Sequence, residues 1–152
     1  MKAVLQRVNN AYVRIDGETQ AEIGKGLLIL FGVEKGDAEE RCAELAYKAM
    51  NLRIFEDGNG KMGRSVKDID GGVIVVSQFT LAGNCKKGLR PDFSTAMEPV
   101  TANQYYEKFV EECRRGYAAD RIQTGIFAAD MKVGLENDGP VTIILESKQE
   151  LL

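Results

Sequence analysis

One stretch decides the fold of this chain: Gly72-Val73-Ile74-Val75-Val76-Ser77-Gln78-Phe79-Thr80-Leu81. Its four consecutive β-branched residues, bounded by Gly71-Gly72, predict a strand that is buried on both faces. The end of the strand is polar, because Ser77, Gln78 and Thr80 follow the apolar run. Buried hydroxyl and amide groups cost roughly 1–3 kcal/mol each when they lack partners. They can satisfy the backbone of a loop, but three such groups at one strand end favour a functional site.

The composition is that of an ordinary globular protein, with 44% hydrophobic and 28% charged residues among 152. This length predicts a single domain, residues 1–152, that buries roughly two-thirds of its unfolded surface. No apolar run reaches the about 20 residues that span a bilayer, and Met1 to Arg7 becomes polar too early for a secretory signal. We therefore expect a cytoplasmic protein that does not contact a membrane.

The sequence contains no histidine, which removes several classes of enzyme. Serine or cysteine nucleophiles activated by imidazole are excluded, and so are zinc sites that need histidine. The three cysteines, at positions 42, 85 and 113, have neither disulfide nor metal-site spacing. We expect no metal and no organic cofactor. The net charge of −3 argues against a broadly basic surface for nucleic acid.

The remaining segments predict an α+β domain with two main helices and a mostly antiparallel sheet or barrel of about seven strands. Asp16-Gly17 predicts a hairpin turn. One helix is expected to begin at Asp37, capped with Glu40, and the other at Thr101, capped with Gln104. The last three strands are expected at residues 121–127, 131–136 and 141–146, and the tail 147–152 is expected to fray.

The most basic loop, residues 82–93, follows the organising stretch directly and carries Lys86, Lys87 and Arg90. A surface charge cluster is usually just solvated, but at this place it could hold a phosphate backbone. Arg7 is a further notable cation, because it interrupts the apolar pattern of the first strand. It is either a solvated residue on a strand face or part of an anion site.

Two segments together resemble the signature motifs of one family, the D-aminoacyl-tRNA deacylases. They are Ser77-Gln78-Phe79-Thr80-Leu81 and Asn137-Asp138-Gly139-Pro140-Val141-Thr142. The resemblance runs from the opening residues 1–8 to the strand at 141–145. It implies a homodimer with two active sites at the subunit interface and tRNA as the partner. It also implies a cis Gly139-Pro140 peptide that inserts from one subunit into the other's site.

The resemblance also implies roles for residues in this sequence. Ser77, Gln78, Phe79 and Thr80 would be the catalytic residues and would line the pocket for the 3′-terminal adenosine and its ester. Arg7, Gly139, Pro140 and Arg90 would bind substrate, and the charge of the basic loop adds Lys86 and Lys87 to this set. The implied activity is hydrolysis of D-aminoacyl-tRNA with L-aminoacyl-tRNA spared. Because glycine has no handedness to reject, we also expect activity on glycyl-tRNA.

Ester hydrolysis needs an oriented water and stabilisation of an oxyanion, both of which backbone amides can supply. The 2′-hydroxyl of the RNA adjoins the ester and could assist proton transfer, which would explain a site without histidine. Thr80 as a nucleophile stays open, although no adjacent base is visible. Two other classes also stay open: a non-catalytic RNA-binding module, and a small-molecule esterase that uses Thr80.

Overall fold

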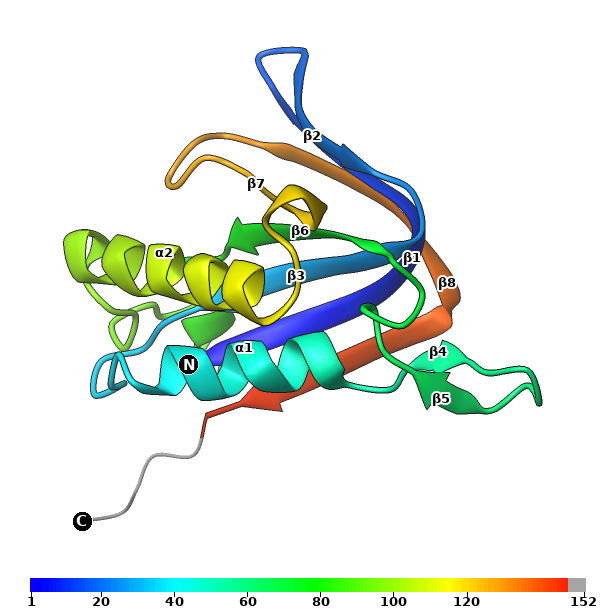
Figure 1. Ribbon diagram of the computed structural model, residues 1–152. Helices are drawn as coiled ribbons and strands as arrows, with labels where there is room; N and C mark the ends of the chain where they lie inside the picture. The colour runs from blue at the N-terminus through cyan, green and yellow to red at the C-terminus, as the bar shows by residue number, and fades with distance from the viewer. Residues whose placement is uncertain (148–152) are drawn as a thin grey trace.

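The computed structural model describes residues 1–147 and consists mainly of a curved six-stranded sheet with two helices over one face (Figure 1). A separate two-stranded hairpin projects beside it. The elements in chain order are β1 (Lys2–Ile15), β2 (Glu18–Ile23), β3 (Gly26–Gly32), α1 (Arg41–Asn51), β4 (Phe55–Glu56), β5 (Met62–Arg64), β6 (Gly72–Ser77), the 3₁₀ helix η1 (Phe79–Ala82), α2 (Pro99–Gly116), the 3₁₀ helix η2 (Ala119–Arg121), β7 (Ile122–Thr124) and β8 (Lys132–Glu146).

The large sheet is mixed, which corrects the expectation of a mostly antiparallel one. Its order is β2-β1-β3-β6-β7, with β8 paired to β1. β1 is antiparallel to β2, β3 and β8, whereas β3, β6 and β7 run parallel to one another. The α+β class and the barrel-like curvature agree with the prediction.

Two helical crossovers explain the parallel half of the sheet. α1 lies in the chain between β3 and β6, and α2 lies between β6 and β7. A strand that returns parallel to its neighbour needs a connection of about a dozen residues or more, usually a helix. The sequence did not indicate this alternation, because long segments, 52–71 with only the short strands β4 and β5 and 83–98 without any, separate the helices from the strands that they connect.

β6 is buried on both faces, as predicted. Val73 and Val75 belong to the core between the sheet and the helices, and Ile74 and Val76 belong to a second core inside the curved sheet. None of the four is more than 2% exposed. The strand ends at Ser77, and residues 79–82 form η1 instead of continuing it.

The side chain of Gln123 joins β2 and β7, the first and last strands in the order of the sheet. The side-chain amide of Gln123 in β7 donates from Nε2 to the backbone carbonyl of Glu22 in β2 at 2.8 Å. Its Oε1 accepts the backbone N–H of Glu22 at 2.9 Å. One glutamine side chain thus makes both hydrogen bonds that a neighbouring strand would make, and it brings the sheet close to a closed barrel.

The hairpin turn is confirmed, because Asp16 and Gly17 both have positive φ, at 51° and 80°. Both predicted helix starts are wrong. α1 begins at Arg41, because the Asp37 carboxylate instead accepts the Glu34 backbone amide and pairs with the chain's α-amino group. α2 begins two residues before Thr101, and its start is described with the pocket below.

The final strands also differ from the prediction. The two strands expected at 131–136 and 141–146 form the single bent strand β8, which begins at Lys132. The strand expected at 121–127 is reduced to β7, residues 122–124. Most of the tail that was expected to fray lies outside the described residues, but Ser147 is placed and donates its backbone amide to Met1. Neither helix combines the length and the apolar character needed to cross a membrane.

The contact between β3 and β6 gives a direct test of this packing. A Cβ on Gly26 would lie 1.8 Å from the carbonyl oxygen of Gly72, whereas a Cβ on Gly24 would meet nothing within 4 Å. We expect Gly26→Ala to lower the free energy of unfolding by about 3 kcal/mol or more, because backbone must move. Gly24→Ala is the matched control and should change it little. Equal effects in urea unfolding would contradict the observed register.

Candidate functional site

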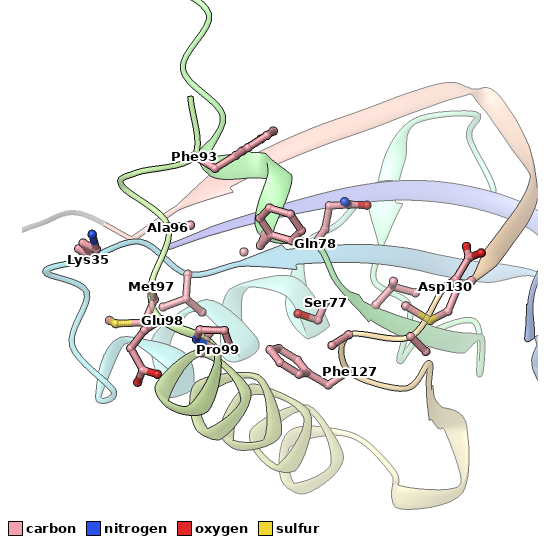
Figure 2. Close-up of a pocket in the computed structure, with 18 of the residues that line it drawn as sticks. Lys35, Ser77, Gln78, Phe93, Ala96, Met97, Glu98, Pro99, Phe127 and Asp130 are labelled. Atoms are coloured by element: carbon pink, nitrogen blue, oxygen red, sulfur yellow. The ribbon is translucent and has the colours of Figure 1, made fainter. Parts of the chain in front are cut away.

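A pocket of about 780 Å³ opens at the C-terminal end of β6. Three of the predicted site residues, Ser77, Gln78 and Phe79, line it (Figure 2). The other walls come from the end of β3, from parts of segment 93–99 and from residues 127–131 between β7 and β8. The volume lies in the range of roughly 300–1,000 Å³ that small-molecule sites occupy.

The chain turns sharply where β6 ends. The backbone N–H of Gln78 donates to Phe31 in β3 at 2.7 Å, and Leu81 donates to the Gln78 carbonyl at 3.2 Å. Gly32 allows this approach, since a Cβ there would lie 2.8 Å from the Gln78 carbonyl oxygen. The ends of two parallel strands therefore fix the position of the predicted motif.

Thr80 lies beside the pocket but does not line it. Its hydroxyl oxygen accepts a hydrogen bond from Nε2 of Gln78 at 2.6 Å. A side-chain amide N–H cannot take up the proton of a hydroxyl group, so this partner cannot activate Thr80 as a nucleophile. Among residues 1–147 no other hydrogen-bond partner of the Thr80 side chain is present.

The backbone N–H groups of Phe79 and Thr80 open the turn into η1. The first N–H groups of a helical turn have no acceptor within it. Neither group donates a hydrogen bond elsewhere among the described residues. They are therefore two free donors close to Ser77 and Gln78, suited to an oxygen that carries negative charge.

An aromatic pair stands at the pocket mouth. The ring of Phe79, which is 58% exposed, contacts Phe93 edge to face with centroids 5.3 Å apart. The walls that contain Phe93, Met97, Phe127 and Met131 were not predicted as part of the site. Phe93 and Met97 are large apolar residues outside any predicted element, and Phe127 and Met131 lie at the ends of two predicted strands, so neither pair signalled a pocket.

The carboxylates near the pocket are occupied by local contacts. Asp92 accepts the backbone amide of Ser94 at 2.9 Å and its hydroxyl at 2.8 Å, and these bonds hold the pKa of the Asp92 carboxyl below its usual value. Asp130 pairs with Lys132 at 3.1 Å. Neither carboxylate is therefore a ready general base.

Glu98, which lines the pocket, caps α2. Its two carboxylate oxygens accept the backbone amides of Thr101 at 2.7 Å and Val100 at 3.0 Å. Hydrogen bonding to Thr101 lowers the pKa of the Glu98 carboxyl, and the Thr101 side chain contributes more to this shift than the backbone amide does. Glu98 with Pro99 at the first helical position thus sets the helix start in place of the expected Thr101.

The second motif forms a bulge in β8. Val8 pairs with Asn137 and Gln6 pairs with Thr142, so four residues of β8, 138–141, stand opposite the single residue Arg7. The Gly139-Pro140 peptide is cis, as the resemblance implies, and both residues are exposed.

Arg7 is buried at 6% exposure, so its interpretation as a solvated charge is wrong. Its Nη1 donates to the carbonyl of Ile54 at 2.8 Å, and its Nε donates to the carbonyl of Asp138 at 3.1 Å. Nε also lies 3.3 Å from the Asp138 carboxylate. One guanidinium thus holds the bulge, and Arg7 does not line the pocket.

The two motifs do not meet within one chain. Ser77 pairs with Phe31, which pairs with Ala3, which pairs with Leu145, and Arg7 lies four residues farther along β1. Three strand spacings of roughly 4.8 Å and four residues of roughly 3.3 Å put the bulge about 20 Å from Ser77 along the sheet. Gly139 and Pro140 are therefore remote from the pocket of their own chain.

The basic loop is exposed throughout Lys86, Lys87 and Arg90. Two backbone hydrogen bonds between Asn84 and Asp92, of 2.8 and 2.9 Å, close its base. None of the three cations lines the pocket. They extend into solvent from the segment that directly follows η1.

The described residues contain no cluster of three or more cysteine, aspartate or glutamate side chains placed to hold a metal. Cys42 and Cys113 are buried, and burial raises the pKa of each thiol to about 12. These two cysteines are core residues and are poor nucleophiles.

Comparison with known proteins identifies the family. A model of the family "D-Tyr-tRNA(Tyr) deacylase" matches residues 4–146. The chain belongs to this family. The resemblance in the two motifs is thereby confirmed, and the family places the chain among hydrolases that act on ester bonds.

Relatives in the deacylase family match nearly the whole chain. Proteins named D-aminoacyl-tRNA deacylase from Geobacter sulfurreducens and Persephonella marina are 55% and 56% identical, covering 97% of this chain and 96% and 99% of theirs. A solved structure titled c-Myc DNA Unwinding Element Binding Protein is 43% identical, with a TM-score of 0.92 over 97% of this chain and 99% of that one. A probable eukaryotic D-amino acid tRNA deacylase shares the fold at 16% identity, with a TM-score of 0.79 over 95% and 97%.

The cap at Glu98 predicts a pH dependence of stability. A carboxyl whose pKa is lowered in the folded state stabilises it above the unfolded pKa of about 4.3, and this contribution is lost as pH falls through the folded value. We expect Glu98→Gln to lower the melting temperature at pH 7, and the difference from wild type to shrink below about pH 4.3. Glu107→Gln, on the exposed side of the same helix, is the control. A difference that does not change with pH would contradict the role of this carboxylate.

Proposed function

We propose that this chain hydrolyses the ester bond of D-aminoacyl-tRNA, releases the free D-amino acid and tRNA, and spares L-aminoacyl-tRNA. The family and the names of the relatives support this substrate. The observation that carries the proposal is the pocket at the end of β6, lined by Ser77, Gln78 and Phe79. It is large enough for an aminoacyl group on an adenosine, and unpaired backbone donors lie beside it.

The proposed mechanism uses the backbone. Water attacks the ester carbonyl carbon, and negative charge develops on the carbonyl oxygen. The N–H groups of Phe79 and Thr80, which have no other acceptor among the described residues, can stabilise that charge. The bond to the ribose oxygen then breaks, and this oxygen takes up a proton and leaves as the hydroxyl of the tRNA 3′ end.

The tRNA itself supplies the proton carrier in this proposal. Thr80 is held by the side-chain amide of Gln78, and Asp92, Glu98 and Asp130 are each engaged in local contacts. The 2′-hydroxyl of the terminal ribose adjoins the ester and can relay the proton. This mechanism needs no metal and no organic cofactor.

We further propose a homodimer in which Gly139-Pro140 of one chain closes the pocket of the other. The bulge is exposed, is fixed by Arg7, and lies about 20 Å from the pocket of its own chain by strand geometry. Opposite handedness exchanges hydrogen and side chain at one carbon, so selection against L esters needs a rigid wall where the L side chain would point. Backbone supplied by the second chain can form that wall.

The same arrangement suggests three finer properties. Glycine has no side chain for a wall to reject, so glycyl-tRNA should also be a substrate. Lys86, Lys87 and Arg90, exposed beside η1, are placed to hold the phosphates of the tRNA backbone. Charged tRNA occurs in the cytoplasm, which is where we expect the protein to act.

The decisive experiment compares purified protein on matched D-tyrosyl-tRNA and L-tyrosyl-tRNA. We expect tyrosine to be released from the D form only. An RNA-binding module would release neither, and a simple esterase would cleave D-tyrosine methyl ester as readily as the tRNA. Equal hydrolysis of the D and L forms would contradict the proposed selectivity.

Thr80→Ala should reduce the hydrolysis rate far less than the loss of a covalent nucleophile, which typically costs several orders of magnitude. The reason is that the hydroxyl only accepts a bond from Gln78. Single-turnover rates on D-tyrosyl-tRNA measure the effect, with Thr19→Ala in the exposed part of β2 as control. Isolation of an aminoacyl ester on Thr80 would overturn the mechanism.

Gly139→Ala should abolish or strongly impair hydrolysis without unfolding the chain. Gly139 has φ of +126°, and a Cβ there would lie 2.8 Å from the Val141 side chain and 3.1 Å from Nη2 of Arg7. The bulge must therefore shift. The control is Gly116→Ala, where a Cβ would meet nothing within 4 Å.

A hybrid dimer tests whether Gly139 acts on the other chain. One chain carries Gly139→Ala, and the other carries Ala102→Trp, which fills the pocket that Ala102 lines. Two affinity tags select the hybrid. It should regain one active site, made from the open pocket of the first chain and the intact bulge of the second. A hybrid no more active than the two parent dimers would contradict the shared site.

A further inference from the structure

Four exposed cations that form no ion pair with any described residue gather in and beside the β4–β5 hairpin. They are Arg53, Lys61, Arg64 and Lys67. By contrast, cations such as Lys108, Arg115 and Arg121 elsewhere on the described surface lie within 4 Å of carboxylates. Among residues 1–147, the one side-chain hydrogen bond of these four cations runs from Lys67 to Asn51 at 3.3 Å. The hairpin and its flanks therefore expose these four cations to solvent, beside the carboxylates of Glu56, Asp57 and Asp68.

The neighbouring carboxylates stabilise the shape of this segment. Asp57 Oδ1 accepts the backbone amides of Asn59 at 2.8 Å and Lys61 at 3.1 Å. Asp68 Oδ2 accepts the backbone amide of Ser65 at 2.8 Å. Local backbone bonds thus hold these acids close to the chain, while the long side chains of the cations extend outward.

The hairpin is attached to the Gly139 bulge through Arg7. The same guanidinium donates to Ile54, directly before β4, and to Asp138, directly before Gly139. Figure 1 shows the hairpin projecting beside the bend of β8. Because one buried side chain fixes both segments, the position of the bulge also determines the position of the hairpin.

This linkage has a consequence that rests on the proposed function. If the bulge closes the pocket of a second chain, the hairpin beside it must stand next to the mouth of that second pocket. From Phe55 to the tip at residues 58–59 the hairpin extends roughly 10–13 Å at about 3.3 Å per residue. That reach is comparable with the last few nucleotides before the 3′-terminal adenosine.

We propose that the β4–β5 hairpin binds the tRNA phosphate backbone in trans, serving the active site of the partner chain. Arg53, Lys61 and Arg64 contact phosphates near the 3′ end on one side, and the basic loop of the partner chain contacts them on the other. Each tRNA is thereby held by both chains. A phosphate backbone matches Arg53, Lys61 and Arg64, which form no ion pair among residues 1–147, although Asp68 attracts Arg64 over a longer distance.

The hybrid dimer with one active site tests this proposal. The substitutions Arg53→Ala, Lys61→Ala and Arg64→Ala are placed either in the Ala102→Trp chain, which donates the bulge, or in the Gly139→Ala chain, which has the open pocket. In the bulge-donating chain they should raise the KM for D-tyrosyl-tRNA roughly tenfold and reduce the salt slope by about 2, with kcat unchanged. In the other chain they should change neither quantity.

Two further measurements make the test specific. D-tyrosyl-adenosine has no phosphate, so its hydrolysis should be unchanged by the hairpin substitutions, and this also reports an intact fold. Removing Lys108, Arg114 and Arg115 from α2 takes away the same charge far from the hairpin and should leave KM unaltered.

Several outcomes would overturn the proposal. They are an effect confined to the chain with the open pocket, equal effects in both placements, no effect in either, or impaired hydrolysis of D-tyrosyl-adenosine. A hybrid without any activity would refute the shared active site itself, and the role of the hairpin in trans would fall with it. An active hybrid that is insensitive to the hairpin refutes the hairpin alone.

Discussion

The structure depends on the strand β6, whose two faces must both be buried away from water. Four adjacent β-branched residues of β6, each worth roughly 1.5–3 kcal/mol when fully buried, require cover on two sides. The helices supply one side and the curvature of the sheet supplies the other. Ser77 and Gln78 cannot continue such a strand without partners, so the chain leaves the sheet there, and the pocket forms at the point of exit.

Arg7 imposes the second constraint. A charge that is 6% exposed is tolerable only because two carbonyls and a carboxylate surround it. Loss of one partner from a buried pair typically costs about 3–5 kcal/mol, so the bulge, the segment before β4 and the first strand are bound to one another. Gly139 and Pro140 are exposed, yet they are positioned by an interaction that lies inside the protein.

The sequence predicted correctly those features that depend on residues close together in the chain. The strand β6 and the Asp16-Gly17 turn could be predicted because no distant residue alters the backbone conformation there. The bulge read as a break between two strands, because the bond that keeps it within β8 comes from Arg7, 131 residues away. Thr101 and Gln104 fit the sequence pattern of a capping box. The helix nevertheless begins earlier, because the Glu98 carboxylate accepts the Thr101 backbone amide. The pocket walls at 93–99 and 127–131 were not predicted, because these segments reach the pocket only through the tertiary fold and carry no local pattern that indicates it.

The contact between the two outer strands, β2 and β7, should open more easily than the rest of the sheet. β1 is held to its neighbours by long ladders of backbone pairs, whereas β2 and β7 are joined by two hydrogen bonds, one donated and one accepted by the Gln123 side chain. Rotation of this single side chain is enough to release the contact. The amide proton of Glu22 should therefore exchange with solvent well before those of the β1 ladder, and the inner core should first meet water from that side.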